Sequence, residues 1–329
     1  MSIRIGMIGA GGIAHSHAQG LAGAEGGRIV AVADPMVERA TELAQSCGAR
    51  AFADYHDLLD LVDAVWICTP QYLHHEQAIA CARAGKHLFV EKPFALSVPD
   101  CQEIIDAARA AGVKLAVGQV FHFYPLFQEV QRRIEDGAIG DLITCWSKRY
   151  ARLPTELTAP WRLNVKQIGS YVLEMQIHEL DLVTWLAGRP LTVRGAVTRN
   201  DPAFPEVDNS MSALITYAGG CIGEVSGSWS PRARFSHRGA IGTHGSIIIS
   251  AWDHFRLSVD GQEDQRIAVS GGDAQFTVGI RAEDQHFLRC IERDEQPAVP
   301  GEAGLRAVAL GLATIASSDT NTVVTLAAE

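Results

Sequence analysis

The stretch that decides the fold is Ile3-Arg4-Ile5-Gly6-Met7-Ile8-Gly9-Ala10-Gly11-Gly12-Ile13-Ala14, at the start of the chain. An apolar run that breaks into a glycine-rich turn and continues as a helix is typical of proteins that hold a dinucleotide pyrophosphate. Gly9 permits the tight turn, Gly11 lets the backbone approach the phosphates, and Ala14 lets the helix pack on the strand. Standing alone, a Gly-x-Gly-x-x-Ala match is weak evidence.

A second apolar run, residues 29–33, strengthens this interpretation because it ends in Asp34. An acid about twenty residues beyond the glycine-rich turn is where a ribose 2′-hydroxyl needs an acceptor. The carboxylate would repel a 2′-phosphate, so the sequence predicts NAD, while Arg39 nearby leaves NADP open as the alternative.

Bulk composition narrows the class of protein. The chain has 329 residues, 47% hydrophobic and 20% charged, which is ordinary for a globular protein of two domains. A net charge of −10 argues against nucleic-acid partners. The seven cysteines contain no Cys-x-x-Cys pair, so neither a disulfide framework nor a zinc site is predicted. No apolar run approaches the ~20 residues of a membrane span. We therefore expect a cytoplasmic protein without membrane contact.

Residues 1–121 alternate between short apolar runs and amphipathic segments, the pattern of βαβ units around a parallel sheet. Apolar strands of this kind are covered by helices on both faces. The predicted strands are 3–8, 29–33, 64–68, 87–91 and 114–118, with a weaker one at 49–52. The predicted helices are 13–23, 36–46, 56–60, 75–84 and 98–111.

Residues 122–329 follow a different pattern, with period-two alternation and hairpin signals at Gly219-Gly220 and Asp260-Gly261. We predict a second domain of α+β type around an open, largely antiparallel sheet. Its predicted strands are 142–150, 192–199, 210–217, 221–229, 237–251, 254–259 and 266–269. Its predicted helices are 174–187, 281–293 and 302–317.

Two loops at the predicted carboxyl edge of the parallel sheet carry chemistry-bearing side chains. Glu91-Lys92-Pro93 follows strand 87–91, and an ammonium there can hold a substrate hydroxyl and stabilise its oxygen as charge develops. The alternative is a solvated loop lysine. Thr69-Pro70 and His74 follow strand 64–68, and a helix-capping surface histidine is the alternative for His74.

A third constellation is Glu174, His178 and Asp181, which share one face if the segment is helical. Carboxylates beside a histidine hold one tautomer and keep its pKa near neutrality, as proton transfer with an alcohol requires. A solvated polar face and a divalent-metal site are the alternatives. Apolar neighbours argue against the former and the lack of a further ligand cluster against the latter, so we predict no metal.

Taken together, Gly9–Ala14, Glu91-Lys92-Pro93, Trp161-Arg162 and the Glu174/His178/Asp181 segment resemble the Gfo/Idh/MocA oxidoreductases (glucose–fructose oxidoreductase, inositol dehydrogenase) almost from end to end. The resemblance implies a Rossmann domain followed by an α/β domain whose open sheet often forms contacts between subunits. It thus implies a homo-oligomer, a dimer or a tetramer, that binds a small polyol or sugar.

The resemblance also implies roles for individual residues. Lys92 and His178 correspond to the family's active-site lysine and catalytic histidine, with Glu174 beside them. The residues expected at the cofactor are Gly9, Gly11, Gly12, Ile13, Asp34, Thr69, Pro70, His74, Glu91 and Gln119. The residues expected at the substrate are Lys92, His122, Trp161, Arg162, Glu174 and His178.

Three positions depart from the family pattern. His122 lies in the segment where the family usually has an arginine, and Gln176 replaces a common glycine. Glu174 is one methylene longer than the usual aspartate. These changes reshape the substrate pocket more than they affect the chemistry.

The function that the sequence predicts is hydride transfer between a nicotinamide cofactor and a secondary alcohol or ketone of a sugar, sugar acid or cyclitol. One alternative is a glycosidase or lyase that keeps its NAD tightly bound. Another is a non-catalytic dinucleotide-binding regulator, although the presence of both Lys92 and His178 counts against it.

Overall fold

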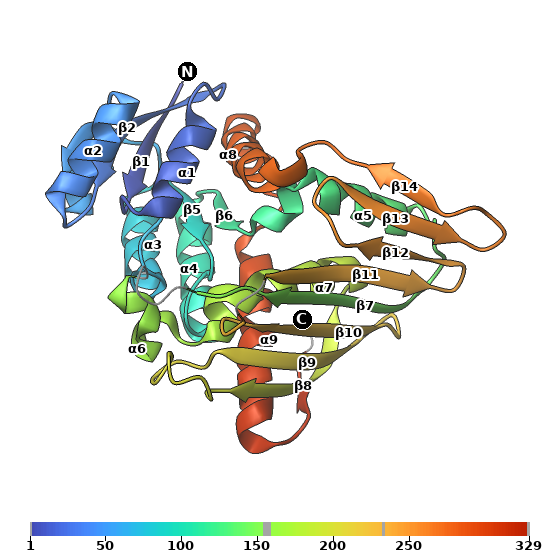
Figure 1. Ribbon diagram of the computed structural model, residues 1–329. Coiled ribbons are helices and arrows are strands. Elements are labelled where there is room, and N and C mark those ends of the chain that lie inside the picture. The colour runs from blue at the N-terminus through green and yellow to red at the C-terminus, as the bar shows by residue number, and fades with distance from the viewer. Residues whose placement is uncertain (1, 154–158, 232–233, 328–329) are drawn as a thin grey trace. The chain divides into compact units, whose positions relative to one another are not determined.

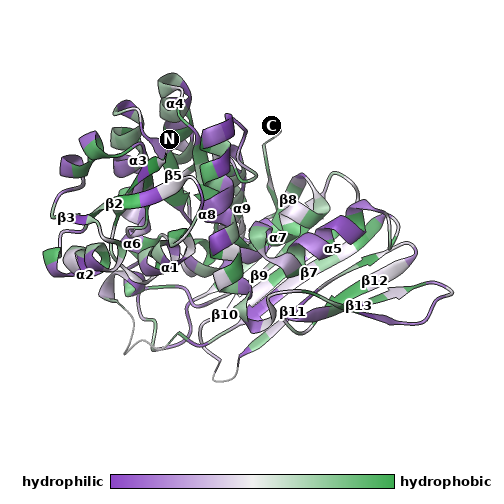
Figure 2. Ribbon diagram, turned by 90° about the horizontal axis from the view of Figure 1, so that it is seen from above, coloured by the Kyte–Doolittle hydropathy of each residue, from purple (hydrophilic) through white to green (hydrophobic). Residues whose placement is uncertain are grey.

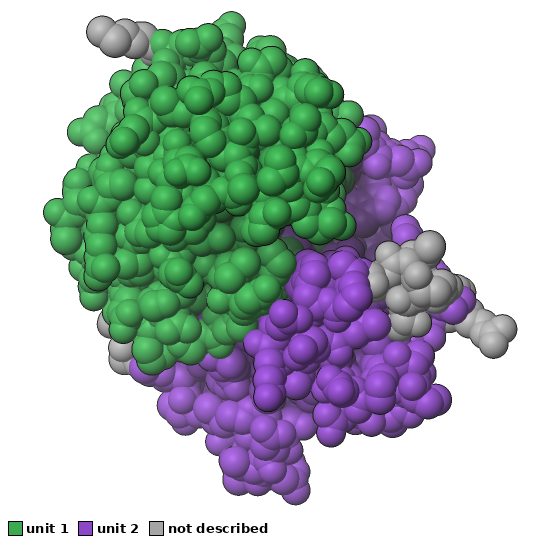
Figure 3. Space-filling model, turned by 90° about the vertical axis from the view of Figure 1, so that its left-hand side faces the viewer, with its two compact units in different colours: residues 1–123, 276–305 green, residues 124–275, 306–329 purple. Residues whose placement is uncertain are grey.

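A computed structural model describes residues 2–153, 159–231 and 234–327. The chain divides into two compact units, coloured green and purple in Figure 3. The first contains residues 1–123 and 276–305, and the second contains residues 124–275 and 306–329. Among the described residues, no helix combines the length and the apolar composition that crossing a lipid bilayer requires.

The first unit is built on a six-stranded parallel sheet with the order β3-β2-β1-β4-β5-β6, which is the Rossmann order. Figure 1 labels β1, β2, β5 and β6 of this sheet. The strands are β1 (Ile3–Ile8), β2 (Gly27–Ala33), β3 (Arg50–Phe52), β4 (Ala64–Ile67), β5 (His87–Glu91) and β6 (Leu115–Gly118). The helices are α1 (Gly12–Leu21), α2 (Val37–Cys47), α3 (His74–Arg83), α4 (Val98–Ala111) and α8 (Gln275–Arg293). The predicted parallel sheet is confirmed together with α1 to α4, except that Tyr55–Leu61 forms a 3-10 helix. The predicted assignment of helix 281–293 to the second domain is wrong, because α8 belongs to the first unit.

The sheet of the first unit is buried on both faces, which explains its continuous apolar strands. All four residues of β4 are buried, and Trp66 is 0% exposed. Purple and green alternate along α8 in Figure 2, as expected of an amphipathic helix. Its apolar side packs Phe287 against Trp66 and Phe89 at ring-centroid distances of 5.4 and 5.8 Å. The chain therefore returns near its end to complete the core of the first unit.

The second unit is built on a nine-stranded sheet with the order β14-β13-β12-β11-β7-β10-β9-β8-β15. All neighbouring strands are antiparallel except β10 and β7, so the predicted largely antiparallel sheet is confirmed. The strands are β7 (Leu142–Tyr150), β8 (Pro190–Thr198), β9 (Ser210–Tyr217), β10 (Ile222–Ser228), β11 (Phe235–Gly242), β12 (Gly245–Ile249), β13 (His254–Val259), β14 (Gln265–Ala268) and β15 (Val324–Thr325).

The predicted single strand at 237–251 is wrong, because the segment forms β11 and β12 joined by a turn at Thr243 and His244. The backbone N–H groups of these two residues donate to the carbonyls of Asp141 and Ile139, at 3.0 and 2.9 Å. Gly242 and Gly245 flank the turn and were the signal for it in the sequence.

The remaining helices interrupt or follow this sheet. They are α5 (Pro125–Glu135), α6 (Val165–Ile168), a π-helical turn (Val172–Gln176), α7 (Ile177–Ala187) and α9 (Gly301–Thr320). The predicted helix at 174–187 thus begins as a π-helical turn, and α5 lies where we predicted no helix. Helix α9 begins in the first unit and ends in the second.

A buried ion pair fastens α7 to the sheet of the second unit. The Glu179 carboxylate accepts from the Arg238 Nε and Nη2 at 2.9 and 2.8 Å, and Ser147 Oγ donates to it as well. Both charged side chains are almost fully buried. Burial alone raises the pKa of Glu179, but Arg238 and Arg149 outweigh it, so the pKa lies below its ordinary value. Glu179 is therefore ionised at neutral pH and compensates the buried charge of Arg238.

Replacing Glu179 with Gln should lower the free energy of unfolding of the second unit by ~3–5 kcal/mol, because the buried guanidinium of Arg238 then loses the carboxylate that faces it. The wild-type stabilisation is present above the ordinary pKa of 4.5 and is lost as the pH falls through the folded-state pKa. Calorimetry between pH 3 and 8 measures both effects.

The matched control is Asp264→Asn, which removes an exposed partner of Arg256 at 3.8 Å and should change stability by only ~0–1 kcal/mol. Equal losses in the two variants would contradict the importance of the buried pair.

Candidate functional site

The glycine-rich turn between β1 and α1 is shaped to receive a ligand. Gly9 has φ +92°, and a Cβ there would lie 2.8 Å from the Cys68 carbonyl oxygen, so only glycine fits. At Gly11 and Gly12, by contrast, an added Cβ would meet no protein atom within 4 Å. The turn is therefore constrained on its protein side and open on the other, directly at the N-terminus of α1.

Asp34 is held beside this turn by backbone donors. Its Oδ2 accepts from the Ala10 N–H and its Oδ1 accepts from the Met36 N–H, both at 2.9 Å. The carboxylate is partly exposed at the end of β2. The structure thus brings together the turn and the acid that the sequence placed twenty residues apart.

The ends of β4 and β5 are tied together by His74. Its Nδ1 lies 2.9 Å from the Pro93 carbonyl oxygen and its Nε2 lies 2.9 Å from the Thr69 carbonyl oxygen. The side chain is fully buried, so the alternative of a surface histidine is wrong. Burial lowers the pKa of His74. Thr69 Oγ1 donates to Gln77 at 2.6 Å, and Pro70 stands before the short helix that leads into α3.

Gln119, just after β6, is a buried side chain whose amide has no partner among the described residues. It is 1% exposed, and neither its Nε2 nor its Oε1 makes a hydrogen bond. Unpaired buried amides are costly, so this position fits a residue that bonds to a bound molecule. The open turn, Asp34 and Gln119 all belong to the first unit.

Lys92 leaves the carboxyl end of β5 and is half-buried. Its backbone N–H donates to Glu91 Oε2 at 3.0 Å. Glu91 itself is 5% exposed and turns inward, where its Oε1 lies 2.9 Å from His17 Nε2. His122, in the 3-10 helix Val120–Phe123, is also half-buried in this unit.

In the second unit, the structure joins Glu174 to Arg162. Arg162 Nε donates to Glu174 Oε1 at 2.7 Å and its Nη2 donates to the same oxygen. The guanidinium also lies 5.8 Å from the centre of the Trp161 ring. Glu174 is 2% exposed, whereas Arg162 and Trp161 are half-buried. These three substrate candidates therefore form one connected group.

His178 and Asp181 lie in the first turns of α7, directly after the π-helical turn that contains Glu174. His178 is half-buried, and Asp181 is 7% exposed. The π-helical turn changes the regular helical spacing between Glu174 and His178, and such turns are frequent at functional sites. Gln176, in the same turn, is fully buried, donates to the Tyr171 hydroxyl at 2.7 Å and packs against Gly227 of β10.

Sequence reasoning missed a buried polar cluster in the first unit. His17, Glu91 and Glu283 offer ligand atoms that all lie within 4.8 Å of one another, and Asp284 contacts His17 as well. The sequence feature that could have pointed to His17 is its position one helical turn after the glycine-rich turn. The two acids of α8 stand 266 or more residues away, and no local pattern connects them to His17.

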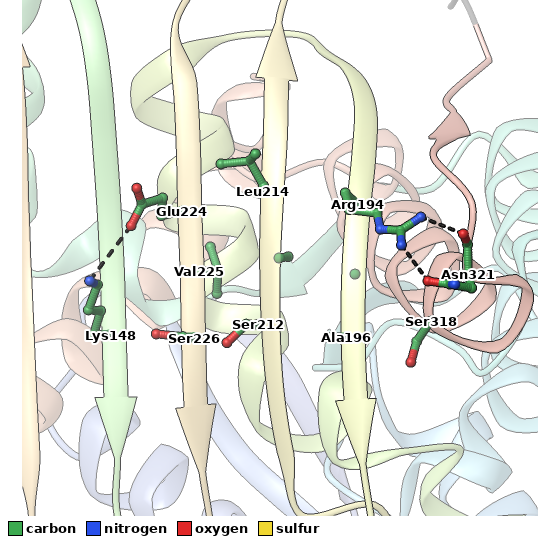
Figure 4. A pocket seen from close by; sticks show the side chains of 12 residues that line it. Lys148, Arg194, Ala196, Ser212, Leu214, Glu224, Val225, Ser226, Ser318 and Asn321 are labelled. Atoms are coloured by element: carbon green, nitrogen blue, oxygen red, sulfur yellow. Dashed lines mark hydrogen bonds and ion pairs between the residues drawn. The ribbon is translucent and has the colours of Figure 1, made fainter.

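A pocket of about 470 Å³ lies on the sheet of the second unit and contains none of the predicted site residues. Figure 4 shows Lys148, Glu224 and Leu214 among its lining, with Arg194 bonded to Asn321 at one side. Its lining comes from β7, β8, β9, β10 and the end of α9, all in the second unit.

Comparison with known proteins agrees with this geometry. Residues 3–119 match the oxidoreductase family with an NAD-binding Rossmann fold, and residues 127–248 match the GFO/IDH/MocA C-terminal domain. The chain is 29% identical to scyllo-inositol 2-dehydrogenase (NAD(+)) of Bacillus subtilis strain 168, covering 90% of this chain and 88% of that protein. It is 33% identical to the 2,7-anhydro-N-acetylneuraminate hydratase of Escherichia coli strain K12, over 57% of this chain and 52% of the relative.

Among solved structures, levoglucosan dehydrogenase in complex with NADH and levoglucosan superimposes with a TM-score of 0.92 at 21% identity, covering 100% of both chains. At this identity the likeness establishes the fold. The two family matches together span most of the described chain, and the glycine-rich turn, Asp34 and the strand order agree with them. The chain therefore belongs to the Gfo/Idh/MocA family of oxidoreductases, with an NAD-binding Rossmann domain at its N-terminus.

Proposed function

We propose that the protein is an NAD-dependent dehydrogenase that acts on a secondary alcohol of a polyhydroxylated compound, namely a sugar, a sugar acid or a cyclitol. The observation that carries the proposal is the open glycine-rich turn beside Asp34, in a chain that also has Lys92 at the carboxyl end of β5. Relatives named as inositol dehydrogenases over nearly the whole chain support the substrate class.

In this proposal, the turn at Gly9, Gly11, Gly12 and Ile13 holds the pyrophosphate, and Asp34 accepts from the ribose. The two oxygens of Asp34 are already oriented by Ala10 and Met36, so its charge is fixed where a 2′-phosphate would approach. This arrangement favours NAD over NADP. NAD, when bound, supplies the acceptor for a hydride.

In this proposal, residues of the chain accept the hydroxyl proton of the alcohol and stabilise its oxygen. His178 accepts the hydroxyl proton as the alcohol is oxidised, and Lys92 donates to the same oxygen and stabilises its developing negative charge. Arg162, held by Glu174, and Trp161 present a polar and an aromatic surface to the rest of the substrate. In the proposal, Glu174 and Asp181 orient the His178 imidazole, and His122 contacts the substrate.

A second candidate function is a reaction without net redox change, in which NAD stays bound. The observation that favours it is the similarity to two 2,7-anhydro-N-acetylneuraminate hydratases, at 33% and 31% identity. Incubation with NAD and a panel of myo-inositol, scyllo-inositol, levoglucosan and 2,7-anhydro-N-acetylneuraminate separates the two functions. A dehydrogenase produces NADH in proportion to product, which absorbance at ~340 nm follows. Turnover of a compound without NADH would instead support the second candidate.

Replacing His178 with Ala should lower kcat by ~10²–10⁴-fold, because the proton acceptor is lost. The affinity for NADH, measured by fluorescence titration, should stay within about twofold of the wild-type value. His244→Ala, at an exposed histidine of the same unit, is the matched control. Equal losses of turnover and of NADH binding in H178A would refute the assigned role.

Replacing Gly11 with Ala should weaken NADH binding at least about tenfold while leaving the melting temperature unchanged, because the new methyl meets only the space reserved for the ligand. Gly9→Ala is the matched contrast, since positive φ and the close carbonyl of Cys68 should cost ~1–3 kcal/mol of stability. Titrations with NADH and NADPH side by side test the preference expected from Asp34. An alanine at position 11 that leaves binding intact would argue against a dinucleotide in this turn.

We further propose that the open face of the nine-stranded sheet contacts a second copy of the chain, giving a dimer or a tetramer. Strand register places Leu214 beside Glu224 on this face, where Leu214 is 48% exposed, Ile222 is 43% exposed and Phe235 is 52% exposed. Exposed apolar side chains bordered by the Lys148–Glu224 ion pair are typical of an interface between subunits.

The double variant Leu214→Arg/Ile222→Arg should therefore be a monomer in light scattering coupled to size-exclusion chromatography, while the wild-type protein is an oligomer. Val37→Arg, which charges an equally exposed apolar position on α2, should leave the assembly unchanged. A wild-type monomer would contradict the proposed interface.

A further inference from the structure

A continuous chain of hydrogen bonds leads from α8 through α1 to the backbone of Lys92. Asp284 Oδ1 lies 2.7 Å from His17 Nδ1, and His17 Nε2 lies 2.9 Å from Glu91 Oε1. The other oxygen of Glu91 accepts from the Lys92 N–H at 3.0 Å. Every member of this chain lies in the first unit, and the side chains of His17 and Asp284 are 0% exposed.

The residues that surround Asp284, His17 and Glu91 leave room for these polar side chains and contact them. Trp66 Nε1 donates to Asp284 Oδ1 at 2.8 Å, and the Phe89 ring stands edge-on to His17 at 5.0 Å. An added Cβ at Gly118 would lie 2.8 Å from Glu91 Oε1, and one at Gly20 would collide with Asp284. The backbone of β6 and of α1 thus leaves room for the two carboxylates, which makes their positions narrowly defined.

The charge state follows from what each nitrogen of His17 faces. Both acceptors are carboxylate oxygens, so an imidazolium satisfies both contacts, whereas a neutral ring donates only one hydrogen bond. Although burial alone lowers the pKa of His17, the carboxylates of Asp284 and Glu91 raise it well above its ordinary value. Burial raises the pKa of both Glu283 and Asp284. Glu283 has no hydrogen-bond partner among the described residues, whereas Asp284 is bonded to His17 and Trp66.

We propose that His17 and Asp284 are positioning residues for Lys92. Asp284 orients the imidazolium, the imidazolium fixes Glu91, and Glu91 fixes the backbone from which the Lys92 side chain starts. This inference rests on the proposed role of Lys92 in catalysis. Small errors in the placement of such a group are costly, because a displacement of ~1 Å can reduce turnover by ~10²-fold.

A divalent metal bound by His17, Glu91 and Glu283 is the competing interpretation of the cluster. The hydrogen-bond interpretation is favoured because both ring nitrogens of His17 already face carboxylate oxygens at 2.7 and 2.9 Å. An imidazolium has no lone pair to offer a metal.

Two substitutions of His17 provide the test, because each keeps an amide donor at one of the two ring positions. Gln carries its nitrogen at the position of Nε2 and retains the bond to Glu91, whereas Asn carries it at the position of Nδ1 and retains only the bond to Asp284. We expect hydrogen exchange of the Lys92 amide to be about tenfold faster in His17→Asn than in wild type, the factor that a hydrogen bond to a charged group is worth. In His17→Gln, exchange should stay within about threefold of wild type.

The same substitutions at His56, an exposed histidine paired with Asp54 in the same unit, are the matched controls and should leave the Lys92 amide unchanged. Exchange is measured residue by residue by NMR or by fragmentation mass spectrometry, and melting temperatures are recorded for every variant. Equal exchange in the Gln and Asn variants would overturn the proposal. So would an equimolar metal in the purified wild-type protein that both His17 variants lack.

Kinetics then link the network to the reaction. With the panel compound that the wild-type protein turns over fastest, His17→Asn should lower kcat about tenfold with little change in the KM for NAD. In a Lys92→Ala background it should cause no further loss, because it acts through Lys92. Additive losses of kcat in the double variant would overturn the inference. A Lys92→Ala variant with normal kcat would instead overturn the proposed role of Lys92, and the exchange experiment would then decide whether His17 positions the Lys92 backbone.

Discussion

The order of the six parallel strands is the constraint on which the first unit depends. Because β1 lies between β2 and β4, the carboxyl ends of three neighbouring strands present the glycine-rich turn, Asp34 and the Thr69 loop at one edge of the sheet. His74 extends this edge to β5 by bonding to both the Thr69 and the Pro93 carbonyls. Residues from four separate segments thereby become neighbours without any of them being close in sequence.

Much of this could be predicted from the sequence. Strands β1, β4 and β5 are short, apolar and bounded by turn residues, and helix α4 is bounded by Ser97 and by Gly112 with φ +66°. Local signals of this kind report local structure reliably. The π-helical turn at Val172–Gln176 could not be predicted, since its sequence is compatible with an ordinary helix and packing selects the wider turn. The turn at Thr243 and His244 differs, because Gly242 and Gly245 on either side of it are a local turn signal within the long apolar stretch.

More of the candidate site could be predicted for the first unit than for the second. In the first unit, glycine, acid and lysine stand at strand ends, so topology alone assigns them to one edge. His17 and Asp284 can be identified as partners only from their contact, which joins residues 267 positions apart. A histidine on an apolar helix face has no local feature that reveals such a buried partner. In the second unit, the pairing of Glu174 with Arg162 likewise depends on tertiary structure, although the two residues stand only twelve positions apart.

The return of residues 276–305 to the first unit has a consequence for biosynthesis. When only the first 123 residues have been synthesised, all six parallel strands exist, yet Trp66 lacks Phe287 as a neighbour and His17 has Glu91 but lacks Asp284. Such a nascent segment leaves the apolar surface around Trp66 and the Asp284 side of His17 uncovered until residues 276–305 have emerged. The two units therefore cannot fold strictly one after the other during synthesis, because the first unit is completed only after residues 124–275 of the second have been made.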